Sequence, residues 1–223
     1  MEKICFIICA NNEALLSECL LYLEQLIVPE GIEKEVIIIK EAESMAAGYN
    51  EAMATSDAKY KVYLHQDTFI VNRNFIDDVI SLFNNDSNIG MLGMVGSEHL
   101  PEDAIMWNAT RVGDFYGYDS ADDLTKKSIK RVEDLYKEVQ VVDGFLMVTQ
   151  YDIIWRDDIL KGWDFYDVSQ CLEFKKAGYK VVVPCQKPAW AIHKCGNPSL
   201  WNYEDSRRIV VKEYLVNDRQ SIL

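Results

Sequence analysis

The first part of the chain alternates between continuous apolar runs and segments whose apolar residues recur at helical spacing. The apolar runs are rich in β-branched residues, as in strands that are buried on both faces of a sheet. They predict strands over residues 4–9, 35–40, 60–64 and 89–95.

Helices are predicted between these strands, because the apolar residues there are spaced three or four apart. An asparagine or serine suited to an N-cap precedes each helix. This order of elements predicts an α/β fold with a mostly parallel central sheet and right-handed crossovers. Ligands in such folds bind beyond the carboxyl ends of the strands, where Asn11, Glu41 and Asp67 lie.

The pattern changes after residue 96. Residues 97–135 lack a regular apolar period, and we expect loops there plus one polar helix over residues 122–136. Strands are then expected over 139–142, 145–149, 179–183 and 189–193, and helices over 168–177 and 204–216. No internal repeat or low-complexity linker marks a boundary, so the 223 residues are expected to form a single domain.

Composition bears more on the partners than on the fold. Hydrophobic residues make up 49% of the chain, which is enough for a substantial core. The formal net charge of −13 at pH 7 makes nucleic acid and anionic membrane surfaces poor partners. A phosphate-bearing ligand would need local compensation by a metal ion, a helix N-terminus or a few basic side chains.

Six cysteines are present without a C-x-x-C pair, so a zinc knuckle is not expected. Several lie in apolar runs, where buried free thiols are usual, and this predicts a reducing, cytoplasmic compartment. The first apolar run, residues 4–10, is short and lacks a small-residue cleavage site, which favours a strand over a signal peptide. No stretch approaches the roughly 20 apolar residues of a membrane span.

The strongest signal for chemistry is the strand over residues 60–64, which runs directly into His65-Gln66-Asp67. A carboxylate at the carboxyl end of a sheet can hold a divalent cation, and that cation can neutralise a diphosphate leaving group. Taken alone, the segment more often marks an Asp that forms an Asx-turn after a strand. A second segment, residues 46–53, places Asn50 among small residues that suit either a nucleotide-sugar contact or tight packing of a helix on the sheet.

Tyr49-Asn50, followed by the strand that ends in His65-Gln66-Asp67, resembles the helix and acidic DxD triplet of family 2 glycosyltransferases. Residues 7–13 resemble the first strand and nucleotide-contacting turn of that family, and residues 36–41 resemble its second strand. These likenesses occur in the family's order along the chain.

The likeness continues downstream. Residues 144–147 resemble the acceptor-side strand of the family, residues 162–171 resemble its catalytic ED segment, and His193 resembles its late metal-binding histidine. With a histidine opening the triplet and Tyr166-Asp167 in the catalytic segment, the pattern is similar to the StrF-like branch from the streptomycin cluster.

The resemblance implies a GT-A type α/β/α sandwich. A nucleotide-sugar-binding half would cover about residues 1–96, an acceptor half about 97–200, and a C-terminal helix 201–223. It also implies a cytoplasmic, inverting glycosyltransferase that uses Mn²⁺ or Mg²⁺. The enzyme would move a sugar from a nucleotide diphosphate sugar, with the uridine diphosphate type favoured, to a hydroxyl acceptor.

The resemblance also implies roles for individual residues. Asp67 and His193 would bind the metal, and the imidazole ligand favours Mn²⁺. Asp167 would be the general base, with Asp164 as the competing candidate. Donor contacts are assigned to Ala10, Asn11, Glu41, Asn50, His65, Gln66 and Asp67, and acceptor contacts to Trp107, Gly144, Trp163 and Asp164.

Asp167 is expected at or just before a helix N-terminus, which would lower the pKa of its carboxyl, whereas a general base works best with a pKa near the working pH. Apolar neighbours such as Phe165 and Tyr166 would have to raise it. Ordinary structural roles stay open for these residues: a helix N-cap for Asp167 and a core or surface position for His193.

Three segments depart from the family pattern. His65 stands where the triplet usually opens with an acid, Lys40-Glu41 replaces the commoner Asp pair, and Tyr166-Asp167 replaces Glu-Asp. The first departure leaves open a non-catalytic protein of the same fold, which binds a glycan or nucleotide sugar without turnover. A nucleotidyltransferase is the second alternative, although the chain has no early glycine-rich, basic phosphate loop.

Overall fold

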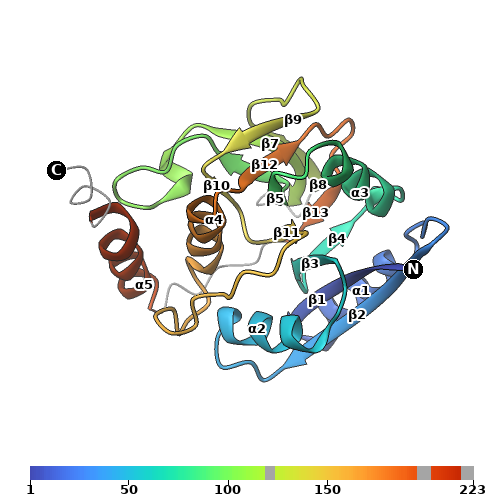
Figure 1. Cartoon of the computed structure of the whole chain (residues 1–223), viewed down its shortest axis with the longest axis horizontal. Coiled ribbons are helices and arrows are strands. Elements are labelled where there is room, and N and C mark those ends of the chain that lie inside the picture. The colour runs from blue at the N-terminus through green and yellow to red at the C-terminus, as the bar shows by residue number, and fades with distance from the viewer. Residues whose placement is uncertain (119–123, 195–201, 217–223) are drawn as a thin grey trace.

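A seven-stranded sheet forms the centre of the molecule, with strand order β2-β1-β3-β11-β5-β12-β9. The computed structural model describes residues 1–118, 124–194 and 202–216 (Figure 1). The strands of this sheet are β1 (Glu2–Ala10), β2 (Ile32–Lys40), β3 (Tyr60–His65), β5 (Ile89–Gly93), β9 (Tyr136–Val139), β11 (Leu146–Thr149) and β12 (Lys180–Pro184).

The sheet is mixed. β1 pairs in parallel with β2 and β3, and β12 pairs in parallel with β5. β11 runs antiparallel to both β3 and β5, and β9 runs antiparallel to β12. The predicted α/β class is therefore confirmed, but the sheet is less parallel than expected, because the pattern of a buried strand does not encode its direction. One consequence is that the amino end of β11 lies at the same edge as the carboxyl end of β3.

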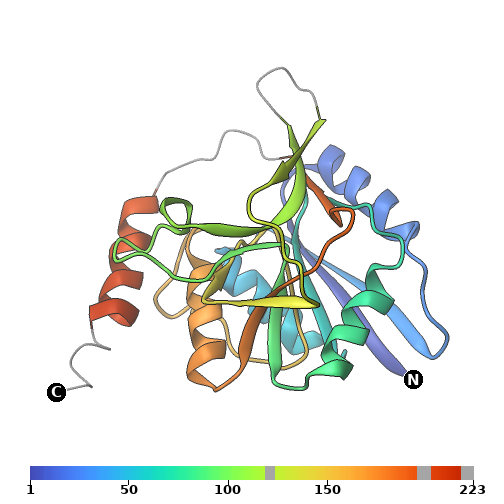
Figure 2. The same cartoon turned by 90° about the horizontal axis from the view of Figure 1, so that it is seen from above.

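Helices cover both faces of this sheet (Figures 1 and 2). Alternate residues of β1 point to opposite faces: Ile4, Phe6 and Ile8 pack in the cluster that includes α1 and α3, while Cys5, Ile7 and Cys9 pack in the cluster that includes α2 and α4. The helices are α1 (Glu13–Glu24), α2 (Met45–Thr55), α3 (Phe75–Asn85), α4 (Tyr166–Lys176) and α5 (Tyr203–Val210), and α5 continues as a π-helix over Val211–Val216.

A second sheet crosses the edge at which β3 ends, with the order β10-β6-β7-β13-β4 and with β8 paired to β7. β4 begins one residue after Asp67, and β13 ends at His193. The antiparallel register of these two strands pairs His193 with Thr68, which brings His193 next to the triplet. The strands are β4 (Thr68–Ile70), β6 (Val95–Ser97), β7 (Arg111–Tyr118), β8 (Leu124–Ser128), β10 (Val141–Val142) and β13 (Ala191–His193).

The polar helix predicted over residues 122–136 is wrong. Residues 124–128 form β8, which pairs antiparallel with β7, and Tyr136 opens β9. Lys and Asp residues are uncommon in strands, but long-range pairing overrides such local preferences. The strand predicted over residues 139–142 is divided between the two sheets at Gln140, whose side chain accepts a hydrogen bond from the Leu100 N–H.

Each of the five cysteines in the described part of the chain is a free thiol: Cys5, Cys9, Cys19, Cys171 and Cys185. Cys195 lies outside the described residues. Across residues 1–118, 124–194 and 202–216, we find no helix with the length and apolar character needed to cross a membrane.

Candidate metal centre and active site

Two histidines and one aspartate meet where β3 and β13 end. His65 is the last residue of β3, Asp67 lies in the turn before β4, and His193 ends β13. The ligand atoms of the three side chains lie within 4.8 Å of one another. Asp67 Oδ1 is 3.6 Å from His193 Nε2 and 3.9 Å from His65 Nδ1. We call these three residues the metal cluster.

The metal cluster fits a divalent ion. Metal–ligand bonds of about 2.1 Å place two ligand atoms at most about 4 Å apart, close to the distances found here. The cluster offers two imidazole nitrogens and one carboxylate oxygen, a donor set suited to transition metals such as Mn²⁺. Three protein ligands would leave positions for phosphate oxygens and water.

The protonation states also suit metal binding. Burial, together with the charge of His193, lowers the pKa of His65 to about 4, so its imidazole is neutral at pH 7. Burial opposes the ionisation of Asp67, but the nearby imidazole of His193, 3.6 Å away, and the charge it can carry outweigh burial and lower the pKa of this carboxyl. A metal ion needs deprotonated ligands, and neither group would have to lose a proton at neutral pH.

The backbone around Phe145 holds the metal cluster together. The N–H of His65 and the hydroxyl of Thr68 both donate to the Phe145 carbonyl, at 3.0 and 3.1 Å. The Phe145 ring stacks on the His193 imidazole with centroids 4.8 Å apart and planes inclined by 16°. The N–H of Lys194 donates to the Asp67 carbonyl at 2.9 Å, which fixes β13 against the triplet.

The middle residue of the triplet, Gln66, is tied to the turn after β1. Its Oε1 accepts from the N–H groups of Asn11 and Asn12 at 3.0 and 2.8 Å, and its Nε2 donates to Asn11 Oδ1 at 2.7 Å. Asn12 is also the N-cap of α1, and Ala10 ends β1 just before this turn. The structure therefore brings Ala10, Asn11 and Gln66 together beside the metal cluster.

Asp167 lies in the first turn of α4, facing the amino end of β11. Its carboxylate accepts from the N–H groups of Gly144 and Val168 at 3.0 and 2.8 Å. Burial raises the pKa of Asp167 to about 7, with a further contribution from the charge of Asp143, although the two N–H groups oppose this shift. Asp167 can therefore gain and release a proton near neutral pH.

Two further carboxyls lie near this helix. Burial raises the pKa of Asp143, which is 8% exposed, and also that of the half-buried Asp164. From the sequence, no role was assigned to Asp143. The sequence signal for Asp143 was its position. It lies between an apolar strand and a glycine, two residues before a second apolar strand.

Tyr166 links the start of α4 to the metal cluster. Its hydroxyl oxygen lies 2.5 Å from Nε2 of His65. The preceding residue, Phe165, has a φ of 62°, which is rare for a bulky side chain, and its ring packs on Tyr203 of α5 with centroids 4.9 Å apart. The role of Tyr166 was not foreseen, because nothing local in the sequence indicates a contact between residues 65 and 166.

Asn50 is engaged inside the protein. Its amide donates to the Trp155 carbonyl and accepts from the Trp155 N–H, both at 2.9 Å. These bonds fix the α2 helix to the segment before α4. A nucleotide contact by Asn50 stays a prediction, and such a contact would have to compete with this pairing.

The remaining predicted residues lie on more open surface. Glu41 follows β2, is exposed and has a φ of 60°. The Trp107 ring is 51% exposed, with the Arg111 guanidinium 5.0 Å from its centroid. Trp163 is 49% exposed. Both side chains are thus partly accessible to a ligand, although Arg111 lies over one face of the Trp107 ring, and their role toward an acceptor stays a prediction.

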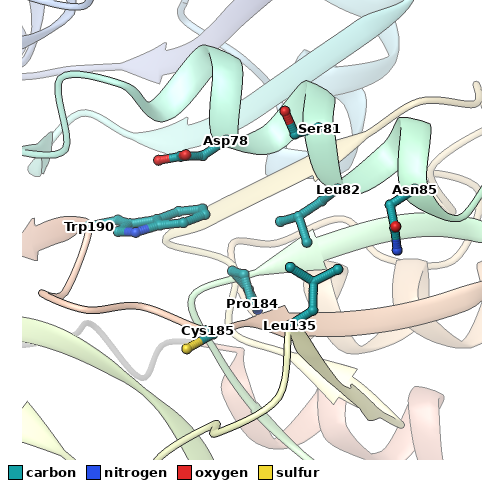
Figure 3. A pocket seen from close by; sticks show the side chains of 8 residues that line it. All are labelled: Asp78, Ser81, Leu82, Asn85, Leu135, Pro184, Cys185 and Trp190. Atoms are coloured by element: carbon teal, nitrogen blue, oxygen red, sulfur yellow. The ribbon is translucent and has the colours of Figure 1, made fainter.

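A separate hollow lies between α3 and the segment before β13 (Figure 3). No residue of the metal cluster lines it, and its one carboxylate, Asp78, accepts a hydrogen bond from Asn72. This hollow therefore lacks the donor set that a diphosphate would need. Its lining residues are Asp78, Ser81, Leu82, Asn85, Leu135, Pro184, Cys185 and Trp190.

Comparison with known proteins relates this geometry to others. A family model described as "Glycosyltransferase like family" matches residues 5–214. No curated protein matches the sequence.

Several solved structures share the fold. The mannosyltransferase PcManGT from Pyrobaculum calidifontis, in complex with GDP-Man and Mn²⁺, has a TM-score of 0.58 and 11% identity, and the match covers 91% of this chain and 60% of that chain. GalNAc-T7 with UDP, GalNAc and Mn²⁺ has a TM-score of 0.60 and 9% identity, covering 94% and 47%. TarS 1-349 from S. aureus has a TM-score of 0.59 and 12% identity, covering 95% and 65%.

The match thus spans about half to two thirds of the length of these three proteins. At such low identity, the likeness shows the fold, and it confirms the predicted GT-A architecture.

Proposed function

The chain belongs to this glycosyltransferase-like family, and on that premise we propose that it transfers a sugar from a nucleotide diphosphate sugar to an acceptor hydroxyl. The observation that carries the proposal is the convergence of His65, Asp67 and His193 at the carboxyl end of β3. The side chain of Tyr166 contacts His65 of this cluster, and Asp167 is the next residue in the chain. One end of the sheet therefore offers a cation site and a proton acceptor together.

The donor binds at the edge formed by β1, β2 and β3. Asp67 and His193 hold the metal, with His65 within reach as a third ligand, and a divalent cation there would neutralise the diphosphate of the donor. In a chain of net charge −13, such local compensation is needed before a diphosphate can bind. Gln66 holds the β1–α1 turn in place, which presents Ala10 and Asn11 to the nucleotide.

The donor nucleotide is a uridine diphosphate sugar in this proposal. The structures of similar fold contain GDP-Man in one case and UDP, with or without a sugar, in others. Glu41, at the carboxyl end of β2, is the residue proposed to contact the base or ribose, because it is exposed and lies at the same edge of the sheet.

The acceptor binds on the side of α4. Asp167 takes the proton from the acceptor hydroxyl as the oxygen forms a bond to the anomeric carbon. The bond from that carbon to the diphosphate oxygen breaks, and the nucleoside diphosphate leaves with the electron pair. Attack from the face opposite the diphosphate inverts the configuration. The pKa of about 7 supports Asp167 in this role, because the base is partly ionised at neutral pH.

Four further residues are proposed to shape the acceptor site: Trp107, Gly144, Trp163 and Asp164. The exposed indoles of Trp107 and Trp163 suit stacking against the apolar face of a sugar ring. The N–H of Gly144 donates a hydrogen bond to Asp167. Because Gly144 has no Cβ, the Tyr166 hydroxyl can lie against it.

Donor binding can be tested by thermal melting with a panel of nucleoside diphosphates, with and without Mn²⁺. We expect a stabilisation that requires both nucleotide and Mn²⁺ and that is lost in Asp67→Asn. The matched control is Asp77→Asn, which removes an exposed carboxylate in the first turn of α3. Absence of a shift with every nucleotide would contradict the proposal.

Catalysis is tested separately, by release of free nucleoside diphosphate from a panel of nucleotide sugars. Turnover should disappear in Asp167→Asn while nucleotide binding persists. Metal-dependent binding without turnover in the unaltered protein would indicate instead a non-catalytic nucleotide-sugar-binding protein of the same fold.

A further inference from the structure

His65 belongs to the metal cluster and also contacts the helix that carries Asp167. Its Nε2 lies 2.5 Å from the Tyr166 hydroxyl oxygen, and its Nδ1 lies 3.9 Å from Asp67 Oδ1. A neutral imidazole carries one proton, so one nitrogen donates and the other keeps a lone pair. His65 can therefore bind a metal through Nδ1 only when the proton is on Nε2.

The hydroxyl of Tyr166 is held in place from several sides. The side chain is 4% exposed, and its ring meets Tyr49 edge-on with centroids 5.8 Å apart. The hydroxyl rests over Gly144, where a Cβ would overlap it. Since the Gly144 N–H also donates to Asp167, the hydroxyl cannot turn away from His65 without disturbing α4 or the start of β11.

We propose that Tyr166 is a positioning residue that keeps His65 as the Nε2–H tautomer and leaves the Nδ1 lone pair for a divalent metal ion. In this arrangement, Nε2–H donates to the phenol oxygen of Tyr166. His65 then becomes the third protein ligand beside Asp67 and His193. This inference rests on the metal-dependent function proposed above.

The alternative arrangement is less favourable. If the Tyr166 hydroxyl donated to Nε2, the proton would sit on Nδ1 and point toward the space between the three ligands. At 3.9 Å, that Nδ1–H would be too far from Asp67 to form a hydrogen bond, and it would face a bound cation. A metal-binding histidine normally donates its other ring N–H to a fixed acceptor, and Tyr166 supplies one here.

The position of Tyr166 also couples the two sides of the site. Asp167 is the next residue of the same helix, so the phenol that orients a metal ligand moves together with the proposed base. Loss of the Tyr166 hydroxyl should therefore weaken metal binding, whereas a merely structural role would affect only folding.

The test uses the full chain and Mn²⁺ alone as the probe. Binding is followed by the electron paramagnetic resonance signal of free Mn²⁺, and the tautomer by ¹⁵N resonances of histidine-labelled protein without metal. In Tyr166→Phe, we expect the Kd for Mn²⁺ to rise by about 10- to 100-fold, and His65 to lose its preference for Nε2–H.

The matched control is Tyr49→Phe. Tyr49 lies in the same aromatic cluster, and its buried hydroxyl has no hydrogen-bond partner among the described residues. This variant should leave both the Mn²⁺ affinity and the His65 tautomer unchanged. Melting temperatures of both variants report whether either substitution disturbs the fold.

Tyr166→Phe with the Mn²⁺ affinity and tautomer of the unaltered protein would overturn the inference. Asp67→Asn separates this failure from failure of the proposed function. If Asp67→Asn also binds Mn²⁺ normally, the metal site itself is wrong. If only Asp67→Asn loses Mn²⁺ binding, the metal site is supported and the positioning role of Tyr166 is wrong. Should Tyr166→Phe fail to fold, Gly144→Ala displaces the same hydroxyl and must weaken Mn²⁺ binding.

Discussion

Replacing Asp167 with Asn should strongly reduce turnover and yet stabilise the folded protein at alkaline pH. Asp167 is half-buried beside Asp143, and burial raises the pKa of Asp167 from its ordinary value of 3.8 to about 7. A carboxyl with a raised pKa resists ionisation in the folded state. Its charge at pH 8 therefore favours unfolding, and the uncharged amide of Asn removes that penalty.

The magnitude follows from the shift of about 3 pKa units at about 1.4 kcal/mol each, which gives a cost of about 4 kcal/mol above pH 7. Because the folded pKa is the higher one, the cost is absent below pH 4 and grows as the pH rises from 4 to 7. The Asn amide points its NH₂ at one of the two N–H donors, which costs about 1–3 kcal/mol at any pH. The variant should thus gain about 1–3 kcal/mol at pH 8 and lose about that much at pH 4.

The assay is urea unfolding of both proteins at pH 5, 6, 7 and 8, with donor turnover measured in parallel. Turnover should fall by about 10²- to 10⁴-fold. Asp86→Asn is the control: the hydrogen bond from Lys180 lowers the pKa of Asp86 to about 2, so its effect on stability should not vary between pH 5 and 8. An equally flat difference for Asp167→Asn would refute the raised pKa, and retained turnover would refute the role as base.

Three other substitutions test the donor side. His65→Asp exchanges an imidazole ligand for a carboxylate, so the affinity for Mg²⁺ relative to Mn²⁺ should rise by about tenfold in calorimetric titrations, and an unchanged ratio would show that His65 is not a ligand. Gln66→Ala removes three hydrogen bonds to the β1–α1 turn and should raise the KM for donor several-fold with kcat nearly kept; Gln66→Glu, which still accepts from both N–H groups, should recover part of the loss. Asn50→Ala leaves the Trp155 N–H without its partner, although the Trp155 carbonyl still accepts from the Asp157 N–H, and should lower the unfolding free energy by about 1–3 kcal/mol with nucleotide affinity unchanged. Weaker nucleotide binding at unchanged stability would instead favour a direct contact.

The elements of the central sheet could be predicted from the sequence where each is long and strongly periodic. β1 contains a continuous apolar run, β3 is apolar over residues 60–64 except for Lys61, and α3 buries one clear face with Phe75, Ile76 and Val79. The second sheet was not predicted as a unit, although β13 lies within the strand expected over residues 189–193. β4, β6 and β13 are each three residues long, and their pairing is set by partners far away in the chain. The direction of β11 was hidden for the same reason.

The candidate site was predictable only in part. The family resemblance assigned Asp67 and His193 to one site, and the structure places their side chains 3.6 Å apart. The pairing of Asn50 with Trp155 and the contact of His65 with Tyr166 join residues 105 and 101 positions apart, so no local pattern could reveal either. The pKa of Asp167 likewise depends on burial and on Asp143, which only the folded structure brings together.

The metal cluster has a consequence for the order in which the chain becomes functional. Its ligands come from residues 65, 67 and 193, so more than half of the 223 residues separate the first pair from the last. During synthesis β3 and Asp67 emerge long before β13, and the cluster cannot assemble until His193 has left the ribosome and β13 has paired with β4. An ion bound there would stabilise only the completed fold. Uptake of metal would then mark the moment at which a newly made chain has closed both sheets.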